Sequence, residues 1–102
     1  MTYHYKEERT NRKQIIKSIG GYGKPLFVDG KPCIFYVDRG HKDGPEYHVI
    51  TDNAIILIYN AWDYELVTAL IARPGQLKRY GVWIPQWILS KAEEHKQKKL
   101  NK

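Results

Sequence analysis

The residues best suited to chemistry lie between Ala72 and Tyr80, where a basic segment follows an apolar run. Pro74-Gly75 favours a turn in this segment, and a turn would hold the surrounding polar side chains close together. Arginine can bind phosphate oxygens through two hydrogen bonds, glutamine can reach the edge of a base, and tyrosine offers a face for stacking. The alternative is a solvated turn whose leucine and tyrosine fill the core. We predict that nucleic acid, with RNA favoured, binds at Arg73, Gln76, Lys78, Arg79 and Tyr80.

His48 and Thr68 are polar residues that interrupt otherwise apolar runs. In an antiparallel sheet they could face the same side as Arg73, although the sequence does not fix the register that decides this. A histidine beside arginines can act as general base toward a ribose 2′-hydroxyl, while Arg73 or Arg79 stabilises the charge that develops on phosphate. This arrangement predicts RNA cleavage without a metal. The alternative is a half-exposed histidine bonded to a neighbouring carbonyl, and the sequence shows no clear acidic partner for His48.

Metal and phosphate-loop chemistry fit the sequence less well. No closed zinc pattern and no cysteine pair accompany the acidic residues and histidines Asp38, His41, Asp43, Glu46 and His48. The glycine-rich stretch from Gly20 to Pro25 has its lysine at the wrong spacing for a phosphate loop, and no Ser or Thr follows that lysine. We therefore predict no metal and no cofactor.

The positive charge is concentrated toward the two ends of the chain. The 102 residues carry a net charge of +6, to which residues 1–20 contribute +3, residues 21–72 contribute −3 and residues 73–102 contribute +6. This asymmetry is typical of proteins that meet nucleic acid or an anionic surface. The alternative is that lysine-rich ends only keep a small domain soluble.

Length and composition favour one folded domain. Hydrophobic residues make up 42% of the chain and charged residues 27%, which is typical of a globular protein. We expect a single domain over residues 1–102 with partly flexible basic termini. Cys33 is the only cysteine, so no internal disulfide can form, and we expect it to be a buried small hydrophobe. Because no signal peptide or membrane-spanning run is visible, we predict a cytoplasmic protein without a membrane partner.

Four or five strands and two helices are predicted to position these residues. Asp29-Gly30 fits a two-residue type I′ turn between Leu26–Val28 and Cys33–Val37. Because Pro32 has no N–H to donate, the second strand is expected to begin after it or to lie at an edge on that side. The apolar run Ile55–Tyr59 is typical of a central strand buried on both faces. The other expected elements are a helical segment within residues 5–19, strands at Tyr47–Thr51 and Leu66–Ala72, and a helix from Pro85 to about Gln97. Ile88 and Ala92 of this helix, with Ile84 just before it, are spaced four apart and are expected to face the core. Together they predict an α+β fold with an antiparallel sheet of four to five strands, an N-terminal helical segment and a C-terminal helix.

Residues 45–80 resemble the small metal-free ribonuclease toxins of the barnase, EndoU, colicin and RelE group. The resemblance rests on the histidine-bearing strand Tyr47-His48-Val49-Ile50-Thr51, the later strand with Leu66-Val67-Thr68, and the basic turn that follows. In that group a sheet carries scattered histidine, threonine, arginine and lysine side chains as the cleavage site. The resemblance implies a metal-free endoribonuclease with His48, Thr68, Arg73 and Arg79 as its catalytic residues.

A binding protein without catalysis is the competing interpretation. Trp62 and Tyr64 lie in a predicted turn, where exposed aromatic side chains would stack on a base or anchor a protein partner, unless they are buried against a helix. Together with the basic C-terminal helix, such turns would suit a phage-type inhibitor that docks on an acidic protein surface. No feature of the sequence indicates an oligomeric state.

Overall fold

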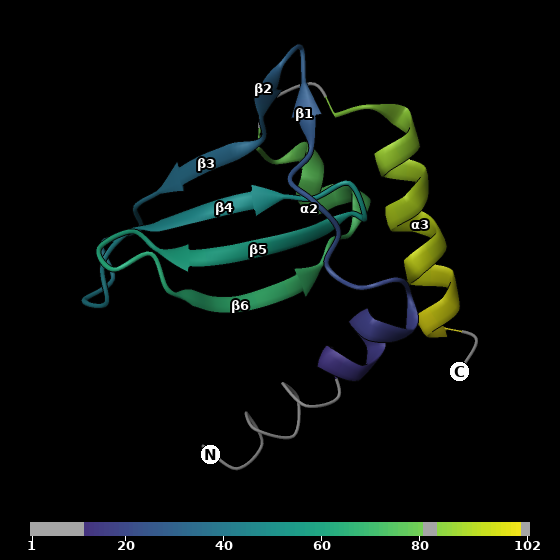
Figure 1. Cartoon of the computed structure of the whole chain (residues 1–102), viewed down its shortest axis with the longest axis horizontal. Coiled ribbons are helices and arrows are strands. Elements are labelled where there is room, and N and C mark those ends of the chain that lie inside the picture. Colours follow the sequence, from purple (N-terminus) through teal and green to yellow (C-terminus); the bar gives the residue numbers. More distant parts are fainter. Residues whose placement is uncertain (1–11, 81–83, 101–102) are drawn as a thin grey trace.

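Figure 1 shows an antiparallel sheet with helices gathered at one of its ends. This computed structural model describes residues 12–80 and 84–100. The strands are β1 (Phe27–Val28), β2 (Lys31–Pro32), β3 (Ile34–Val37), β4 (Glu46–Ile50), β5 (Ile55–Asn60) and β6 (Leu66–Ile71), and the helices are α2 (Pro74–Lys78), α3 (Gln86–Leu100) and a helical stretch at residues 12–18. The predicted α+β class is confirmed. The outer parts of the termini, for which flexibility was predicted, and residues 5–11 of the predicted N-terminal helix lie outside the described residues.

The main sheet is a meander in which each strand pairs with the next one along the chain. Its order is β3-β4-β5-β6, and all three pairs are antiparallel. In β5 the residues from Ile55 to Ile58 are at most 9% exposed. The prediction of a central strand buried on both faces is confirmed, and this burial explains why the run contains no polar residue.

β1 and β2 form a separate two-stranded hairpin. Asp29 and Gly30 have φ angles of 53° and 78°, which agree with the predicted type I′ turn. The return strand was predicted at Cys33–Val37, and this boundary was wrong, because β2 ends at Pro32 and β3 pairs with β4. Cys33 marks the change of partner, since its N–H bonds to the residue before β1 while its carbonyl bonds to the last residue of β4.

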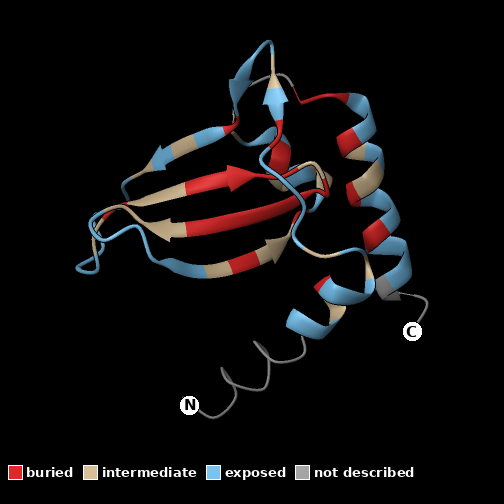
Figure 2. Ribbon diagram, viewed as in Figure 1, coloured by how far each residue is buried: buried red, intermediate tan, exposed pale blue. Residues whose placement is uncertain are grey.

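Buried residues, red in Figure 2, run along β4 and β5, and two apolar clusters pack on the two faces of the sheet. On one face, alternate residues of β4 and β5 pack against α2 and α3, and the buried members of this cluster include Ile50, Ile56, Ile58, Leu77, Ile84, Ile88 and Ala92. The predicted inner face of the C-terminal helix is therefore confirmed. The opposite face packs against residues 12–18, and its buried members are Ile16, Val49, Ile55, Leu57 and Ala69.

The two ends of the sheet differ. α3 and residues 12–18 lie at the end where β4 finishes and β5 begins, whereas the loops after β3 and β5 project at the other end (Figure 1). Each face of the sheet therefore has a helix-covered half and a half nearer these loops. In the part of the chain that the structure describes, no helix has the length and apolar character needed to cross a bilayer.

Candidate nucleic-acid interface

The predicted basic turn is a short helix, α2, whose position is fixed by one buried leucine. The backbone N–H of Arg73 donates to the side-chain oxygen of Gln76 at 2.9 Å, and the Arg73 carbonyl accepts from the N–H groups of Gln76 and Leu77. Leu77 is 0% exposed and belongs to the core. The segment thus has a feature of each interpretation made from the sequence. Its leucine fills the core, as a structural turn would require, while its cations remain exposed, as a nucleic-acid site would require.

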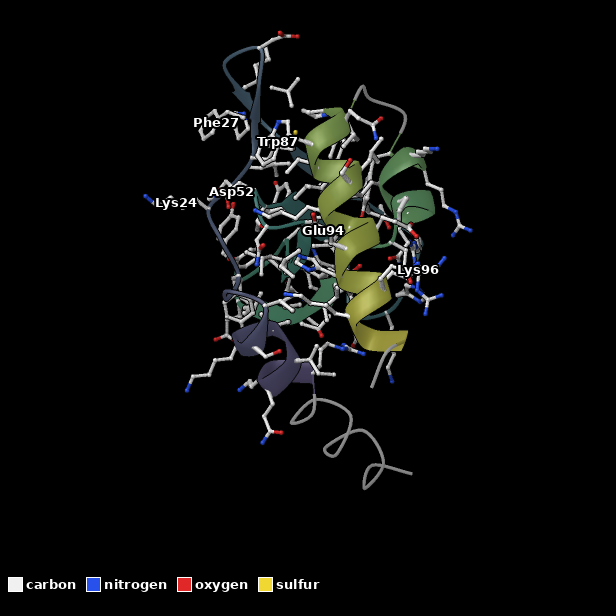
Figure 3. The ribbon with its side chains drawn as sticks, turned by 90° about the vertical axis from the view of Figure 1, so that its right-hand side faces the viewer. Lys24, Phe27, Asp52, Trp87, Glu94 and Lys96 are labelled. Atoms are coloured by element: carbon white, nitrogen blue, oxygen red, sulfur yellow. The ribbon has the colours of Figure 1, made fainter. Side chains whose placement is uncertain are left out.

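Arg73 and Arg79 come together with a lysine from α3. Both arginines are exposed and, with Lys96 and Glu93, line a hollow of about 430 Å³. Figure 3 shows Lys96 on the flank of α3 that lies on the same side as α2. Lys78 lines a neighbouring hollow of about 640 Å³ that α2 and α3 also share. With three cations and one carboxylate, the first hollow is suited to an anionic ligand.

Tyr80 turns inward and ties the end of α2 to the sheet. Its ring stacks on Phe35 with 4.7 Å between centroids, and its hydroxyl lies 2.8 Å from Nδ1 of His48. Burial raises the pKa of the Tyr80 phenol, while Arg39 opposes this rise and Glu46 adds to it. The protonated phenol can donate a hydrogen bond to Nδ1 of the histidine.

His48 has an acidic partner, contrary to the expectation from the sequence. Its Nε2 lies 3.1 Å from Oε1 of Glu46, and the histidine is only 4% exposed. Because the carboxylate of Glu46 only accepts, we assign the proton to Nε2, which donates to it, so that Nδ1 accepts from the Tyr80 hydroxyl. The expected lack of an acidic partner was wrong, and so was the alternative of a half-exposed histidine bonded to a carbonyl. The sequence did contain the signal, since residues two apart on a strand share a face.

Thr68 and Arg73 lie apart from His48. Ile58 of β5 is the register partner of both His48 and Thr68, so a whole strand separates the histidine from the threonine. The hydroxyl of Thr68 accepts a hydrogen bond of 3.1 Å from Nη1 of Arg12. Arg73 follows the far end of β6. The four residues predicted to be catalytic therefore do not meet at one point: two arginines share the hollow between α2 and α3, and the histidine and threonine lie elsewhere.

The exposure of Trp62, Tyr64 and Cys33 tests the predictions made for these residues. Trp62 and Tyr64 are each 69% exposed, so the alternative that they are buried against a helix was wrong. Cys33 is buried, as expected, and burial raises the pKa of its thiol.

Within residues 12–80 and 84–100, no three histidine, cysteine, aspartate or glutamate side chains gather closely enough to hold a metal.

Three residues that the sequence did not single out contact or adjoin the predicted ones. Lys96 joins the arginines, Phe35 stacks on Tyr80, and Arg12 bonds to Thr68. Each comes from a different element than its neighbour, and no local pattern in the sequence predicts such a meeting.

The chain was compared with known protein families, curated proteins and solved structures, and none of them matches it. Its function is therefore inferred from its own geometry, burial and charge.

Proposed function

We propose that this protein binds RNA through the α2–α3 surface, defined by Arg73, Arg79 and Lys96. The observation that carries the proposal is the meeting of these three cations at one hollow of about 430 Å³, where Glu93 is the single carboxylate among the described lining residues. Guanidinium groups bind phosphate oxygens through two parallel hydrogen bonds, and lysine adds a mobile positive charge. A phosphodiester chain fits this surface because it presents regularly repeated negative charges.

The α2–α3 surface is fixed before any ligand binds. Leu77 is fully buried, and the side-chain oxygen of Gln76 accepts a hydrogen bond from the N–H of Arg73 at the start of α2. Ordering a flexible loop on binding costs free energy, so a fixed backbone leaves more of the interaction energy for affinity. The arginines are thus presented on a rigid support.

Removing both arginines should weaken RNA binding and reduce its salt dependence. For Arg73→Ala/Arg79→Ala we expect the dissociation constant for a single-stranded RNA to rise about tenfold or more at about 0.1 M salt. The slope of log affinity against log salt should fall in magnitude by about 1.4, because each lost phosphate contact contributes about 0.7. Fluorescence anisotropy across a series of salt concentrations measures both quantities, and circular dichroism verifies the fold.

The matched control is Lys24→Ala/Lys31→Ala, which removes the same charge from two exposed residues, one in the segment before β1 and one in β2. It should change the affinity much less, because diffuse charge contributes less than direct phosphate contacts. Equal weakening in both double variants would mean that net charge alone drives binding. An arginine variant that binds as tightly as the parent would exclude the α2–α3 surface as the site.

A second candidate function, RNA cleavage without a metal, is favoured by the hydrogen-bonded chain Glu46–His48–Tyr80. Glu46 holds the imidazole as the tautomer whose Nδ1 accepts a proton. In the cleavage step, Tyr80 takes the proton of a ribose 2′-hydroxyl while it passes its own proton to His48. The 2′-oxygen then attacks the adjacent phosphorus, and the 5′-oxygen leaves with a proton from solvent. The products are a 2′,3′-cyclic phosphate and a free 5′-hydroxyl.

Cleavage should depend on the Tyr80 hydroxyl and not on added metal. RNA incubated with the protein in a chelator should gain cyclic phosphate ends, and Tyr80→Phe should lower the rate by about 100-fold or more. The same substitution should leave RNA affinity unchanged, because the phenylalanine ring can still stack on Phe35. Mass spectrometry of the product ends measures the reaction. Intact RNA at high protein concentration would exclude cleavage and leave the binding proposal standing.

A further inference from the structure

The face of the sheet opposite α2 and α3 carries a row of tyrosines at the end nearer the β3–β4 and β5–β6 loops. Tyr36 is the register partner of Tyr47, and Tyr47 is the partner of Tyr59, so three rings stand side by side across β3, β4 and β5. Tyr36 and Tyr47 meet edge to face with 5.6 Å between centroids. Tyr36 is 60% exposed, and this tyrosine row continues into the half-exposed Leu66, the partner of Tyr59. Contiguous exposed aromatic and apolar area of this kind indicates an interaction surface.

A fourth ring, that of Tyr64, is held over the tyrosine row by the loop between β5 and β6. The Tyr64 and Tyr47 rings stack with 6.1 Å between centroids and 13° between planes. Tyr64 is 69% exposed and has a φ angle of 60°, a left-handed conformation that is unusual for an aromatic residue. Its N–H donates to the carbonyl of Asn60, whose side-chain oxygen accepts from the N–H groups of Trp62 and Asp63. These hydrogen bonds keep the exposed ring in place without a ligand.

The tyrosine row leads into a cleft that carries positive charge. The cleft has a volume of about 250 Å³ and is lined by Arg12 and Lys13 on one side and by residues 66–69 of β6 on the other. Arg12 is fixed there by its hydrogen bond to Thr68. Leu66 connects the two features, since it lines the cleft and is also the register partner of Tyr59. We name this feature the Arg12–Lys13 cleft.

We propose that unpaired RNA bases stack on Tyr36 and Tyr64 while the phosphates of the same strand reach the Arg12–Lys13 cleft. This inference rests on the proposed RNA binding and specifies single-stranded RNA as the ligand. Every base has a face that can stack on an aromatic ring, and pairing in a duplex hides that face. Asp63 and Glu65 flank Tyr64 and repel phosphate, so the strand leaves the tyrosines toward the cleft.

Charge favours RNA over a protein partner at this face. A protein that buried the tyrosine row would need only matching apolar side chains, whereas the cations at one end of the row match the phosphates that every stacked nucleotide carries. Exposed rings held in place on a strand and on a hydrogen-bonded loop, with cations beside them, are suited to binding single strands without reading their sequence.

The tyrosine row and the α2–α3 surface lie on opposite faces of the sheet. β6 is the edge strand between them: it lines the Arg12–Lys13 cleft, and Arg73 follows its last residue closely. The molecule is only 20 Å deep along its shortest axis. A strand that passes around the β6 edge can therefore contact both surfaces.

The test replaces the two exposed tyrosine rings by an apolar side chain that cannot stack on a base. Tyr36→Leu/Tyr64→Leu is compared with Tyr36→Phe/Tyr64→Phe, using a labelled RNA of about 12 uridines, alone and paired with its complement. We expect the leucine variant to bind the single strand more weakly than the parent by about 25-fold or more, because two stacked bases are lost and each contributes about 5- to 150-fold. The phenylalanine variant should bind like the parent, and the duplex should bind all three proteins equally. Lys13→Gln should reduce the salt slope by about 0.7.

The outcomes separate this inference from the function on which it rests. If the parent binds the single strand and the leucine variant binds it equally well, base stacking at this face is overturned. A protein partner would then be the better explanation for the exposed tyrosines. If the phenylalanine variant loses as much affinity as the leucine variant, the hydroxyl groups rather than the rings carry the contact, and the inference also fails. If the parent binds neither RNA, the proposed function falls together with the inference. Since both tyrosines are more than half exposed, the variants should fold, and circular dichroism verifies this.

Discussion

Replacing Leu77 by alanine is expected to lower the free energy of unfolding by about 3–4 kcal/mol. The side chain is 0% exposed and packs within the cluster that joins α2, α3 and the sheet. Its truncation removes buried apolar area and leaves a cavity that the surrounding core cannot fully close. A small domain has a total stability of about 5–15 kcal/mol, so this one change removes a large share of it. Urea denaturation followed by circular dichroism measures the loss.

Leu66→Ala is the matched control for this prediction. Leu66 is 47% exposed on β6, so the same chemical change should cost less than about 1 kcal/mol. Similar losses in the two variants would contradict the anchoring role of Leu77. Because Leu77 positions α2, its alanine variant should also bind RNA more weakly under conditions where it remains folded, although both arginines are intact.

The sequence predicted the parts of the fold whose causes are local. The run Ile55–Tyr59 indicated a strand buried on both faces, because only apolar residues fit both sides. Asp29-Gly30 indicated its turn type, because that turn needs positive φ at two positions. The four-residue spacing of Ile84, Ile88 and Ala92 indicated the face that α3 buries. Each of these signals is contained within a few neighbouring residues.

The parts that could not be predicted depend on register and on the meeting of distant elements. Tyr80 looked like an exposed stacking residue beside its arginines, but it reaches across 32 positions to His48. The tyrosine row consists of residues from three different strands, and only their pairing places the rings side by side. A shift of one residue in any strand would have moved its tyrosine to the other face. The sequence therefore predicted the basic cluster near α2 but not the aromatic surface on the other side of the sheet.

The turn between β4 and β5 joins three parts of the molecule through Asn53. Its side-chain nitrogen donates to the carbonyls of Ile19, at 3.2 Å, and Gly21, at 2.7 Å. Its own carbonyl accepts from Nε2 of His95 on α3 at 3.0 Å. In the same turn, the side chain of Asp52 accepts from the N–H of Lys24, and Figure 3 shows these two residues on one side of the molecule. The segment that follows residues 12–18 is thus fastened to both the sheet and α3.

Gly23→Ala should disrupt this junction, with an expected loss of about 2–5 kcal/mol in the free energy of unfolding. Gly23 has a φ angle of +82°, and a Cβ there would lie 2.5 Å from Oδ1 of Asp52 and 2.9 Å from Cβ of Asn53. The left-handed backbone costs about 1–2 kcal/mol for alanine, and forcing the Asp52–Asn53 turn aside costs about 1–3 kcal/mol more. Gly21→Ala separates the two contributions, because Gly21 has a φ angle of +85° and a Cβ there would meet no heavy atom within 4 Å beyond its chain neighbours. In urea denaturation followed by circular dichroism, Gly21→Ala should lose only about 1–2 kcal/mol of unfolding free energy. Equal losses at the two glycines would show that backbone strain alone accounts for the effect, without the contact to the Asp52–Asn53 turn.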